Sequence, residues 1–304
     1  MQKLFLFCIL MISFHQLRAQ YTICNGKTYA APVFSDSGLK KLNANLQIAK
    51  TNFETDSSNA DHIIWYGRRL AYLTRYDEAI AVFSKGITLH PTDARMYRHR
   101  GHRYLSTRCY DKAIADFEKA AELIKGKEDQ IEPDGMPNAQ NIPTSTLQSN
   151  IWYHLGLAYF LENNLEKAAA AYKQCIKVSK NPDMYVATAN WYYITLWKLD
   201  KVKEAEAVLR KIHKKMKLIE NKDYHTILLI YKGVQSPAEI RTKFLEDDNP
   251  LSNATIGFGL ANYYLSVGKA AEGVDLLERV KAMPQWGSFA VMAAEMLLRE
   301  LGRN

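Results

Sequence analysis

Residues with chemically active side chains gather most densely in one short stretch, 95–103. His99 and His102 stand three positions apart, as two imidazoles on one face of a helix would. The residues around them include four arginines, Arg95, Arg98, Arg100 and Arg103. Their positive charge would repel a metal cation, so the histidines do not predict a metal site. The stretch favours an anion site or an ordinary charged surface.

No part of the sequence has the pattern of a known kind of catalytic centre. There is no Gly-rich phosphate loop, no Cys/His set with metal-ligand spacing and no serine elbow. Glu132 and Asp134 could face His102 as an acid/base set, but any chain of this length allows such combinations. We therefore expect no enzymatic activity, no metal and no cofactor.

Residues 1–19 predict a secretory signal peptide. Lys3 precedes an uncharged apolar run, Leu4–Phe14, and the small Ala19 stands at a suitable cleavage point. This run of about eleven residues is too short for a bilayer span, which needs about twenty. The alternatives are a buried amphipathic start or an uncleaved anchor. We expect an exported protein, periplasmic or secreted, with no integral membrane span elsewhere in the chain.

The net charge favours acidic partners. The formal charge of +8 falls to +6 when Lys3 and Arg18 are removed with the leader, which contains no acid. A basic exported chain is suited to acidic proteins or peptides, and the compartment disfavours nucleic acid.

The elements that must position these side chains are repeated at a step of 34 residues between Ala60 and Lys127. The recurring pairs are Gly67 and Gly101, Tyr76 and Tyr110, Ala79 and Ala113, and Phe83 and Phe117. A fixed step of this size predicts a solenoid, in which each unit buries its apolar face against its neighbour. The small residues allow two helices to approach closely, and the aromatic ring fills the space between them.

The pattern resembles the tetratricopeptide repeat, a helix-turn-helix of 34 residues, in an exported bacterial form. The strong units are 60–93, 94–127 and 149–182, and weaker units lie near 186–219, 219–252 and 254–287. The resemblance implies an all-α fold, a right-handed α-solenoid of about six helix-turn-helix repeats with capping helices.

These units divide the chain into a signal peptide and three further parts. The parts are 20–59, a lead-in with a capping helix; 60–287, the repeat domain; and 288–304, a C-terminal capping helix. A loop insertion at about 126–147 has no helical period and contains Pro133, Gly135, Pro137 and Pro143. A loop of that length is more often functional or mobile than neutral.

Three cysteines follow the leader: Cys24, Cys109 and Cys175. An odd number in an oxidising compartment allows at most one intrachain disulfide, with three pairings open. Cys175 falls where the repeat places a small buried residue, which favours a core thiol. The pairing to test first is Cys24 with Cys109.

In the tetratricopeptide family, one stripe of the first helices lines a concave surface that binds partners. The resemblance implies these groove residues here: Arg68, Tyr72, Arg95, Arg98, His102, Tyr153, Phe160, Asn190 and Trp197. The arginines would fork an acidic side chain or a free C-terminal carboxylate, because planar guanidinium donors meet a carboxylate two at a time. The alternative is that the arginines are solvated and that Tyr153 and Phe160 contact the next repeat or the long loop.

We therefore expect a non-catalytic scaffold or adaptor of the cell envelope that binds a protein or extended peptide in its groove. One alternative is an enzyme or small-ligand receptor with residues 128–147 as a lid; another is a structural subunit of an envelope complex. A pocket closed by 128–147 and lined by convergent acids and His102 would favour the receptor, and an open continuous groove would favour the adaptor.

Overall fold

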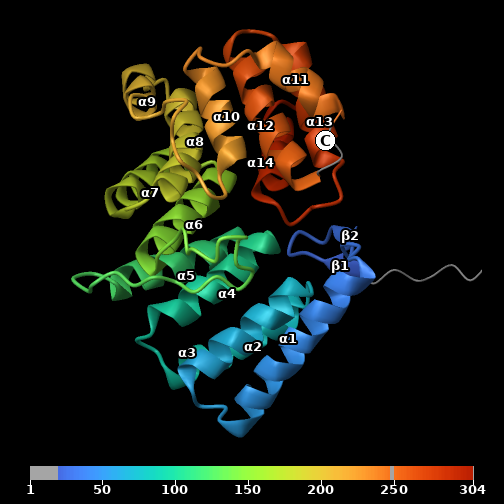
Figure 1. Cartoon of the computed structure of the whole chain (residues 1–304), viewed down its shortest axis with the longest axis vertical. Helices are drawn as coiled ribbons and strands as arrows, with labels where there is room; N and C mark the ends of the chain where they lie inside the picture. Colours follow the sequence, from blue (N-terminus) through green and yellow to red (C-terminus); the bar gives the residue numbers. More distant parts are fainter. Residues whose placement is uncertain (1–19, 247–249, 304) are drawn as a thin grey trace, which may run out of the picture.

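The computed structural model describes residues 20–246 and 250–303, and these are mostly helical (Figure 1). The expected signal peptide lies outside the described residues. The fold is an all-α helical repeat solenoid, as the sequence predicts, with one small hairpin at its N-terminal end.

The chain begins with the antiparallel strands β1 (Gln20–Thr22) and β2 (Thr28–Ala30), followed by α1 (Asp36–Thr55). Six helix pairs follow: α2 (Ala60–Tyr72) with α3 (Tyr76–Leu89), α4 (Ala94–Ser106) with α5 (Tyr110–Leu123), α6 (Leu147–Leu161) with α7 (Leu165–Val178), α8 (Pro182–Lys198) with α9 (Val202–Leu209), α10 (Lys222–Tyr231) with α11 (Pro237–Glu246), and α12 (Pro250–Ser266) with α13 (Ala270–Lys281). The last helix is α14 (Phe289–Glu300).

Side-chain caps determine where several first helices begin. Asn59 accepts hydrogen bonds from the backbone N–H groups of Asp61 and His62 at the start of α2. Asn181 accepts one from Met184, and Pro182 occupies the first turn of α8. The fourth pair therefore begins four residues before the boundary of 186 that the repeat step predicts.

Each helix pair turns through one residue with a left-handed backbone. These residues are Thr74, Arg108, Asn163, Asp200, Gly233 and Gly268, with φ between 55° and 78°. Four of the six are not glycine, although this conformation costs a residue with a Cβ about 1–2 kcal/mol. The backbone repeat is therefore more regular than the sequence, because only two of the six turns carry glycine, the residue that favours this conformation.

Close helix packing within the pairs agrees with the sequence pattern. A Cβ placed on Gly67 would lie 2.5 Å from the ring of Phe83, and one on Gly101 would lie 3.2 Å from Phe117. The small residues of the 34-residue step are thus required by the aromatic side chains opposite them.

The row of helix pairs curls until its end meets its beginning. Helix α14 packs on α12 and α13 and also touches α6, and its end lies beside the β-hairpin in Figure 1. We expected a helix with one apolar face capping the far end of the row. Instead, eight of its twelve residues are buried, because neighbours cover it on more than one side.

The contact between the two ends forms what we call the closure junction, made by Cys24, Tyr29, Arg108, Trp286 and Glu295. The indole ring of Trp286 stacks on Tyr29 with ring centroids 4.9 Å apart. Arg108 donates to the carbonyl of Trp286 at 2.7 Å and pairs with Glu295 at 3.0 Å. The junction thus joins the hairpin, the α4–α5 turn and the C-terminal segment.

A disulfide between Cys24 and Cys109 ties the hairpin to the second helix pair. This is the pairing that we expected to test first. Cys175 is a free, fully buried thiol, as expected of a core position. Burial raises its pKa to about 11, so it stays protonated.

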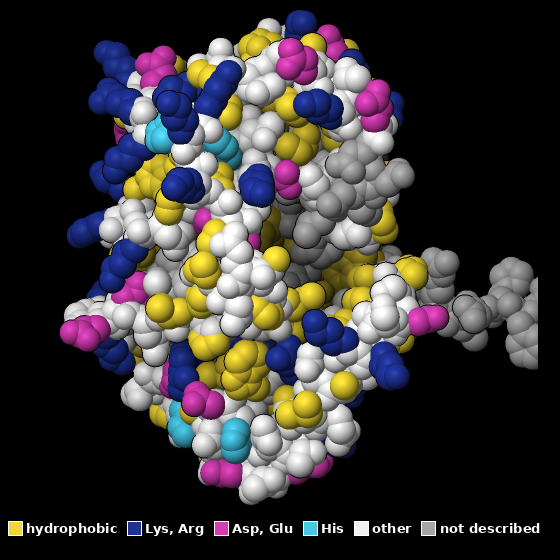
Figure 2. Space-filling model, viewed as in Figure 1, with side chains coloured by type: hydrophobic (Ala, Val, Ile, Leu, Met, Phe, Trp, Pro, Cys, Tyr) yellow, Lys and Arg dark blue, Asp and Glu magenta, His cyan; other side chains and the backbone are white. Residues whose placement is uncertain are grey.

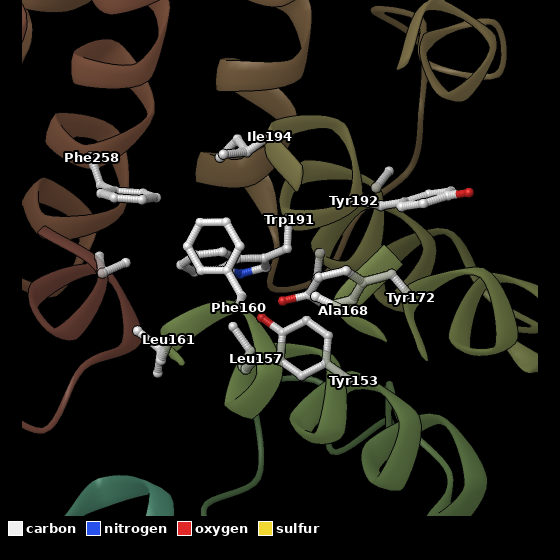
Figure 3. Packing of buried hydrophobic residues seen from close by; sticks show 14 of the residues in the cluster. Tyr153, Leu157, Phe160, Leu161, Ala168, Tyr172, Trp191, Tyr192, Ile194 and Phe258 are labelled. Atoms are coloured by element: carbon white, nitrogen blue, oxygen red, sulfur yellow. The ribbon is translucent and has the colours of Figure 1, made fainter. Parts of the chain in front are cut away.

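The main core lies where α6, α8 and α12 meet. Phe160 is 5.5 Å from Trp191 between ring centroids, and Trp191 is 5.3 Å from Phe258. The hydroxyl groups of Tyr153 and Tyr172 point toward the indole of Trp191 (Figure 3). Thirteen of the fifteen residues of α6 and twelve of the seventeen residues of α8 are buried, so these first helices have no free concave face.

Candidate functional site

The long connection between α5 and α6 lies across the concave side of the N-terminal half. We call residues 126–146 the strap. Arg69 of α2 donates to the carbonyl of Gly135 at 2.7 Å. Farther along, Asn138 and Thr144 donate to Glu220, just before α10, at 2.8 and 2.6 Å. The strap is therefore held by α2 at Gly135 and by the segment just before α10 at Asn138 and Thr144.

Gly135 is where the strap comes closest to the helices below. A Cβ at this position would clash with the hydroxyl group of Tyr72. Only glycine, which has no Cβ, allows the strap to cross Tyr72 this closely. The sequence around Gly135 did not show this requirement.

Beneath the strap is a cavity of about 100 Å³. Its lining residues are Arg68, Ala71, Tyr72, Phe83, Arg98, His99, His102, Arg103 and Glu132. Helices α2 and α4 supply all of them except Phe83 of α3 and Glu132 of the strap. Of the features that we expected of a small-ligand receptor, the cavity has a cover from residues 128–147 and His102 in its lining, but one acid, Glu132, in place of convergent acids.

The charges around this cavity are strongly unequal. Arg98 and Glu132 are both buried, and Arg98 Nε lies 3.1 Å from Glu132 Oε2. Among the described residues, no carboxylate oxygen lies within 4.0 Å of a nitrogen of Arg68 or Arg103. Three guanidinium groups therefore share one carboxylate.

Burial lowers the pKa of Arg98 and of Arg103, and the neighbouring arginines act in the same direction on both. A guanidinium group nevertheless stays protonated in proteins. The charge around the cavity is fixed across the physiological pH range.

The histidines of this region are neutral. Burial, assisted by the nearby arginines, holds the pKa of His99, His102 and His154 well below its usual value. Arg98 Nη1 lies 3.2 Å from Nδ1 of His99 and 3.4 Å from Nδ1 of His102. Because arginine can only donate, both Nδ1 atoms accept, and both imidazoles carry their proton on Nε2.

His154 has the opposite tautomer. Its Nδ1 lies 2.6 Å from the carbonyl oxygen of Asn150, and a carbonyl can only accept. His154 Nδ1 is therefore protonated. Its ring packs 4.4 Å from that of His102, which joins the α4 wall of the cavity to α6.

Four of the residues expected in the groove meet at this cavity: Arg68, Tyr72, Arg98 and His102. Arg68 Nη2 donates weakly to the hydroxyl of Tyr72 at 3.4 Å. These residues lie together as the stripe implies, but under the strap instead of along an open groove.

Three others were wrongly placed in the groove. Tyr153, Phe160 and Asn190 are 7%, 0% and 2% exposed. The superhelix closes, so the stripe of α6 and α8 faces α10, α12 and α14 and forms core. The alternative, in which Tyr153 and Phe160 contact the next repeat or the long loop, is correct for Phe160, whose ring packs on Trp191 of α8. Tyr153 also lies against Tyr224 of α10 and Phe289 of α14.

Arg95 and Trp197 lie apart from the cavity. Arg95 pairs with Asp61 at 2.7 Å and with Asp93 at 2.6 Å, so its guanidinium already has two carboxylates. Trp197 is 37% exposed at the end of α8, beside Asn262.

Sequence reasoning missed two groups of the site. Arg103 was taken only as a neighbour of the histidines, because its spacing of five from Arg98 corresponds to about 140° around a helix and does not predict a shared face. His154 gave no signal, because it becomes relevant only when α6 packs on α4.

The outer surface of the strap has a different character. Ile131, Met136 and Ile142 are 67%, 67% and 48% exposed. Next to them, the guanidinium groups of Arg68 and Arg69 lie 4.6 and 5.0 Å from the ring of Trp65. Figure 2 shows hydrophobic side chains across the middle of this face, at the level of α4, α5 and the green connection of Figure 1.

Within residues 20–246 and 250–303, no group of three His, Cys, Asp or Glu side chains is placed to hold a metal ion. None of the helices in this part of the chain is both long and apolar enough to span a bilayer.

Comparison with known proteins agrees with the repeat. Family models of the tetratricopeptide repeat match residues 67–128 and 149–182. A stretch of 108 residues is 32% identical to tetratricopeptide repeat protein 13 of Homo sapiens, and covers 36% of this chain and 10% of that protein. The chain thus matches about a tenth of the length of this curated relative.

Solved structures are similar in fold. The anaphase-promoting complex hetero-tetramer Cut9–Hcn1 aligns with a TM-score of 0.51 at 15% identity, over 86% of this chain and 46% of that one. A tetratricopeptide repeat protein from Parabacteroides merdae aligns with a TM-score of 0.48 at 13% identity, over 84% of this chain and 93% of that one. At these identities the likeness concerns the fold alone.

Proposed function

Since this chain is a protein of tetratricopeptide repeats, whose fold suggests a scaffold for protein interactions, we propose that it binds a protein partner on the outer surface of its strap. We further propose that it does so as an exported, non-catalytic adaptor of the cell envelope.

One observation carries the proposal: a polar insertion leaves three large apolar side chains in solvent. Ile131, Met136 and Ile142 all project from the strap, while most large apolar residues of the chain are buried. Large apolar side chains that lie exposed on one short segment favour an interaction site. Trp and Arg, which Trp65 and Arg69 supply here, are the residues most enriched at the energetic centres of interfaces.

The position of this surface replaces the groove that the sequence predicts. A long peptide has no access to Phe160 or Asn190, since the C-terminal helices cover them. Arg69 remains half-buried beside the strap. It favours a partner that combines apolar side chains with acidic ones, because arginine binds carboxylates with paired, charge-assisted hydrogen bonds.

Export is supported by the disulfide between Cys24 and Cys109, because such bonds persist in oxidising compartments. The leader composition of residues 1–19 agrees with this. Cell fractionation followed by mass spectrometry of the N-terminal peptide tests it, and the expected mature chain begins at Gln20. Recovery of the uncleaved chain from the cytoplasm would contradict export.

The strap surface is tested by a triple variant, Ile131→Ser, Met136→Ser and Ile142→Ser. The matched control is Ile48→Ser, Val202→Ser and Val267→Ser, three exposed apolar residues on α1, α9 and the α12–α13 turn. Each protein is used to capture partners from the envelope fraction of the source cells. We expect the partner of the wild type to be lost with the strap variant and kept with the control.

Equal capture by the two triple variants would exclude the strap as the binding surface. Circular dichroism and thermal melting of both variants show whether they are folded, and the exposed positions of all six residues make small changes in stability the expected result.

A further inference from the structure

We propose that the cavity beneath the strap is a binding site for a small oxyanion with two negative charges, phosphate or sulfate. This goes beyond the proposed partner binding, which uses the other side of the strap.

The first argument is charge. Arg68, Arg98 and Arg103 bring three positive charges to the cavity, and Glu132 brings one negative charge, which leaves an excess of two. Asp134 of the strap is close enough for Arg68 to act on its pKa, but it does not line the cavity. Because burying like charges without counterions is costly, a dianion in this space would neutralise them.

The second argument is the unused donor capacity of buried groups. The Nε atom of Arg98 is fully buried and has no hydrogen-bond partner. It lies 3.1 Å from Glu132 Oε2, but its N–H does not point at that oxygen. Within the described residues, the guanidinium group of Arg103 has one polar or aromatic partner, the ring of Tyr76, whose centroid lies 5.6 Å away. Buried donors in native proteins nearly always find an acceptor.

The neutral histidines complete the set of donors. His99 and His102 accept from Arg98 on Nδ1, so each carries its proton on Nε2. His99 Nε2 lies 3.7 Å from Glu132 Oε1, so an anion would compete with that carboxylate for this N–H. Tyr72, whose hydroxyl lies 3.4 Å from Arg68 Nη2, adds a further hydroxyl at the wall. Apart from Glu132, the polar groups around the cavity are donors or can act as donors, which is the requirement for an oxyanion.

Size restricts the ligand. The cavity is small, about 100 Å³. A tetrahedral oxyanion fits this space, whereas a peptide segment or a nucleotide does not. Arginine is the residue that binds phosphate oxygens with two parallel hydrogen bonds.

The test is isothermal titration calorimetry of the full mature chain with sodium phosphate, sodium sulfate and sodium acetate in turn, against sodium chloride at equal ionic strength. Thermal unfolding in the same salts gives a second readout. We expect heat of binding and a raised Tm with phosphate or sulfate, and at least about tenfold weaker binding of the monoanion acetate.

The variants Arg68→Gln and Arg103→Gln should each weaken the binding of the dianion at least about tenfold, the loss of one charge-assisted contact. The matched control is Arg95→Gln, which removes a charge from the same helix as Arg103 but outside the cavity. Its affinity should equal that of the wild type. Should Arg103→Gln fail to fold, the half-buried Arg68→Gln decides alone.

Three results would overturn the proposal. The first is a wild type whose Tm and titration heats in phosphate and sulfate equal those in chloride. The second is an equal loss of affinity in Arg95→Gln and Arg68→Gln, which would indicate the general positive field of the surface. The third is acetate bound as tightly as the dianions.

Discussion

The two halves of the molecule use the same helix pair and cover its concave side in different ways. In α4 of the N-terminal half, the concave stripe carries Arg98 and His102, and a loop covers it. In α6 of the C-terminal half, the same stripe carries Tyr153 and Phe160, and whole helices cover it. A polar stripe thus keeps a cavity beneath a strap, whereas an apolar stripe becomes core.

The difference shows that the pairing of helices and the closure of the superhelix depend on different residues of a repeat chain. Pairing depends on small and aromatic residues at fixed steps, such as Gly67 and Phe83. Closure depends on what the concave stripe can bury, and on contacts between distant segments such as Arg108 with Glu295.

The largest expected effect is the difference in unfolding free energy between a core substitution and a surface substitution in the C-terminal half. Phe160→Ala should lower the free energy of unfolding by about 3–5 kcal/mol, because it removes a fully buried ring and leaves a cavity. Trp197→Ala, on the exposed end of α8, should cost about 1 kcal/mol or less. Urea denaturation of both variants measures the difference.

Similar small losses of unfolding free energy in Phe160→Ala and Trp197→Ala would contradict this account, since Phe160 would then lie in an accessible groove. Because both residues belong to the same predicted stripe, each serves as the other's control.

The second expected effect concerns the N-terminal half. The double variant Cys24→Ser and Cys109→Ser should lose about 2–5 kcal/mol of unfolding free energy, since the disulfide spans 85 residues. Reduction of the wild type by dithiothreitol should lower its denaturation midpoint to that of the variant. A midpoint that reductant leaves unchanged would show that the hairpin does not depend on the bond.

The third effect is a loss of stability in acid. The pKa values of His99, His102 and His154 are depressed in the folded chain, whereas in the unfolded chain they lie near about 6.5. The unfolded state therefore binds more protons in acid. The stability is fully present above about pH 6.5 and falls below it, by up to about 1.4 kcal/mol per pH unit for each histidine.

Urea midpoints between pH 7.5 and 5.5 measure this slope. His154→Gln should make it shallower, and His213→Gln, at an exposed position between α9 and α10, should leave it unchanged. A midpoint that rises on acidification would contradict buried, neutral histidines.

The sequence was sufficient to predict the repeat, the helix pairs, the insertion and the favoured disulfide. The cationic end of the site was also predictable, because Arg68, Arg98 and His102 share one stripe across two repeats. The position of the strap was not, since it depends on Gly135 passing over Tyr72 and on Glu220 from the fifth pair.

The repeat pattern also could not predict that the superhelix closes. Exposed aromatic residues in a groove and buried ones in a core have the same spacing along α6, so Phe160 could be assigned to either. The junction is made by single long-range pairs, such as Trp286 with Ala30, that no periodic pattern marks.

Zero-length cross-linking with a carbodiimide tests the closure of the superhelix most directly. Lys27 Nζ lies 3.6 Å from Glu295 Oε1, across the meeting ends of the chain, and Lys198 Nζ lies 2.8 Å from Glu300 Oε2, between the ends of α8 and α14. The structure predicts both cross-links by mass spectrometry, at a level comparable to that of the local pair Lys119 and Glu122. Recovery of the local link without either long-range link would contradict a closed superhelix and restore an open groove.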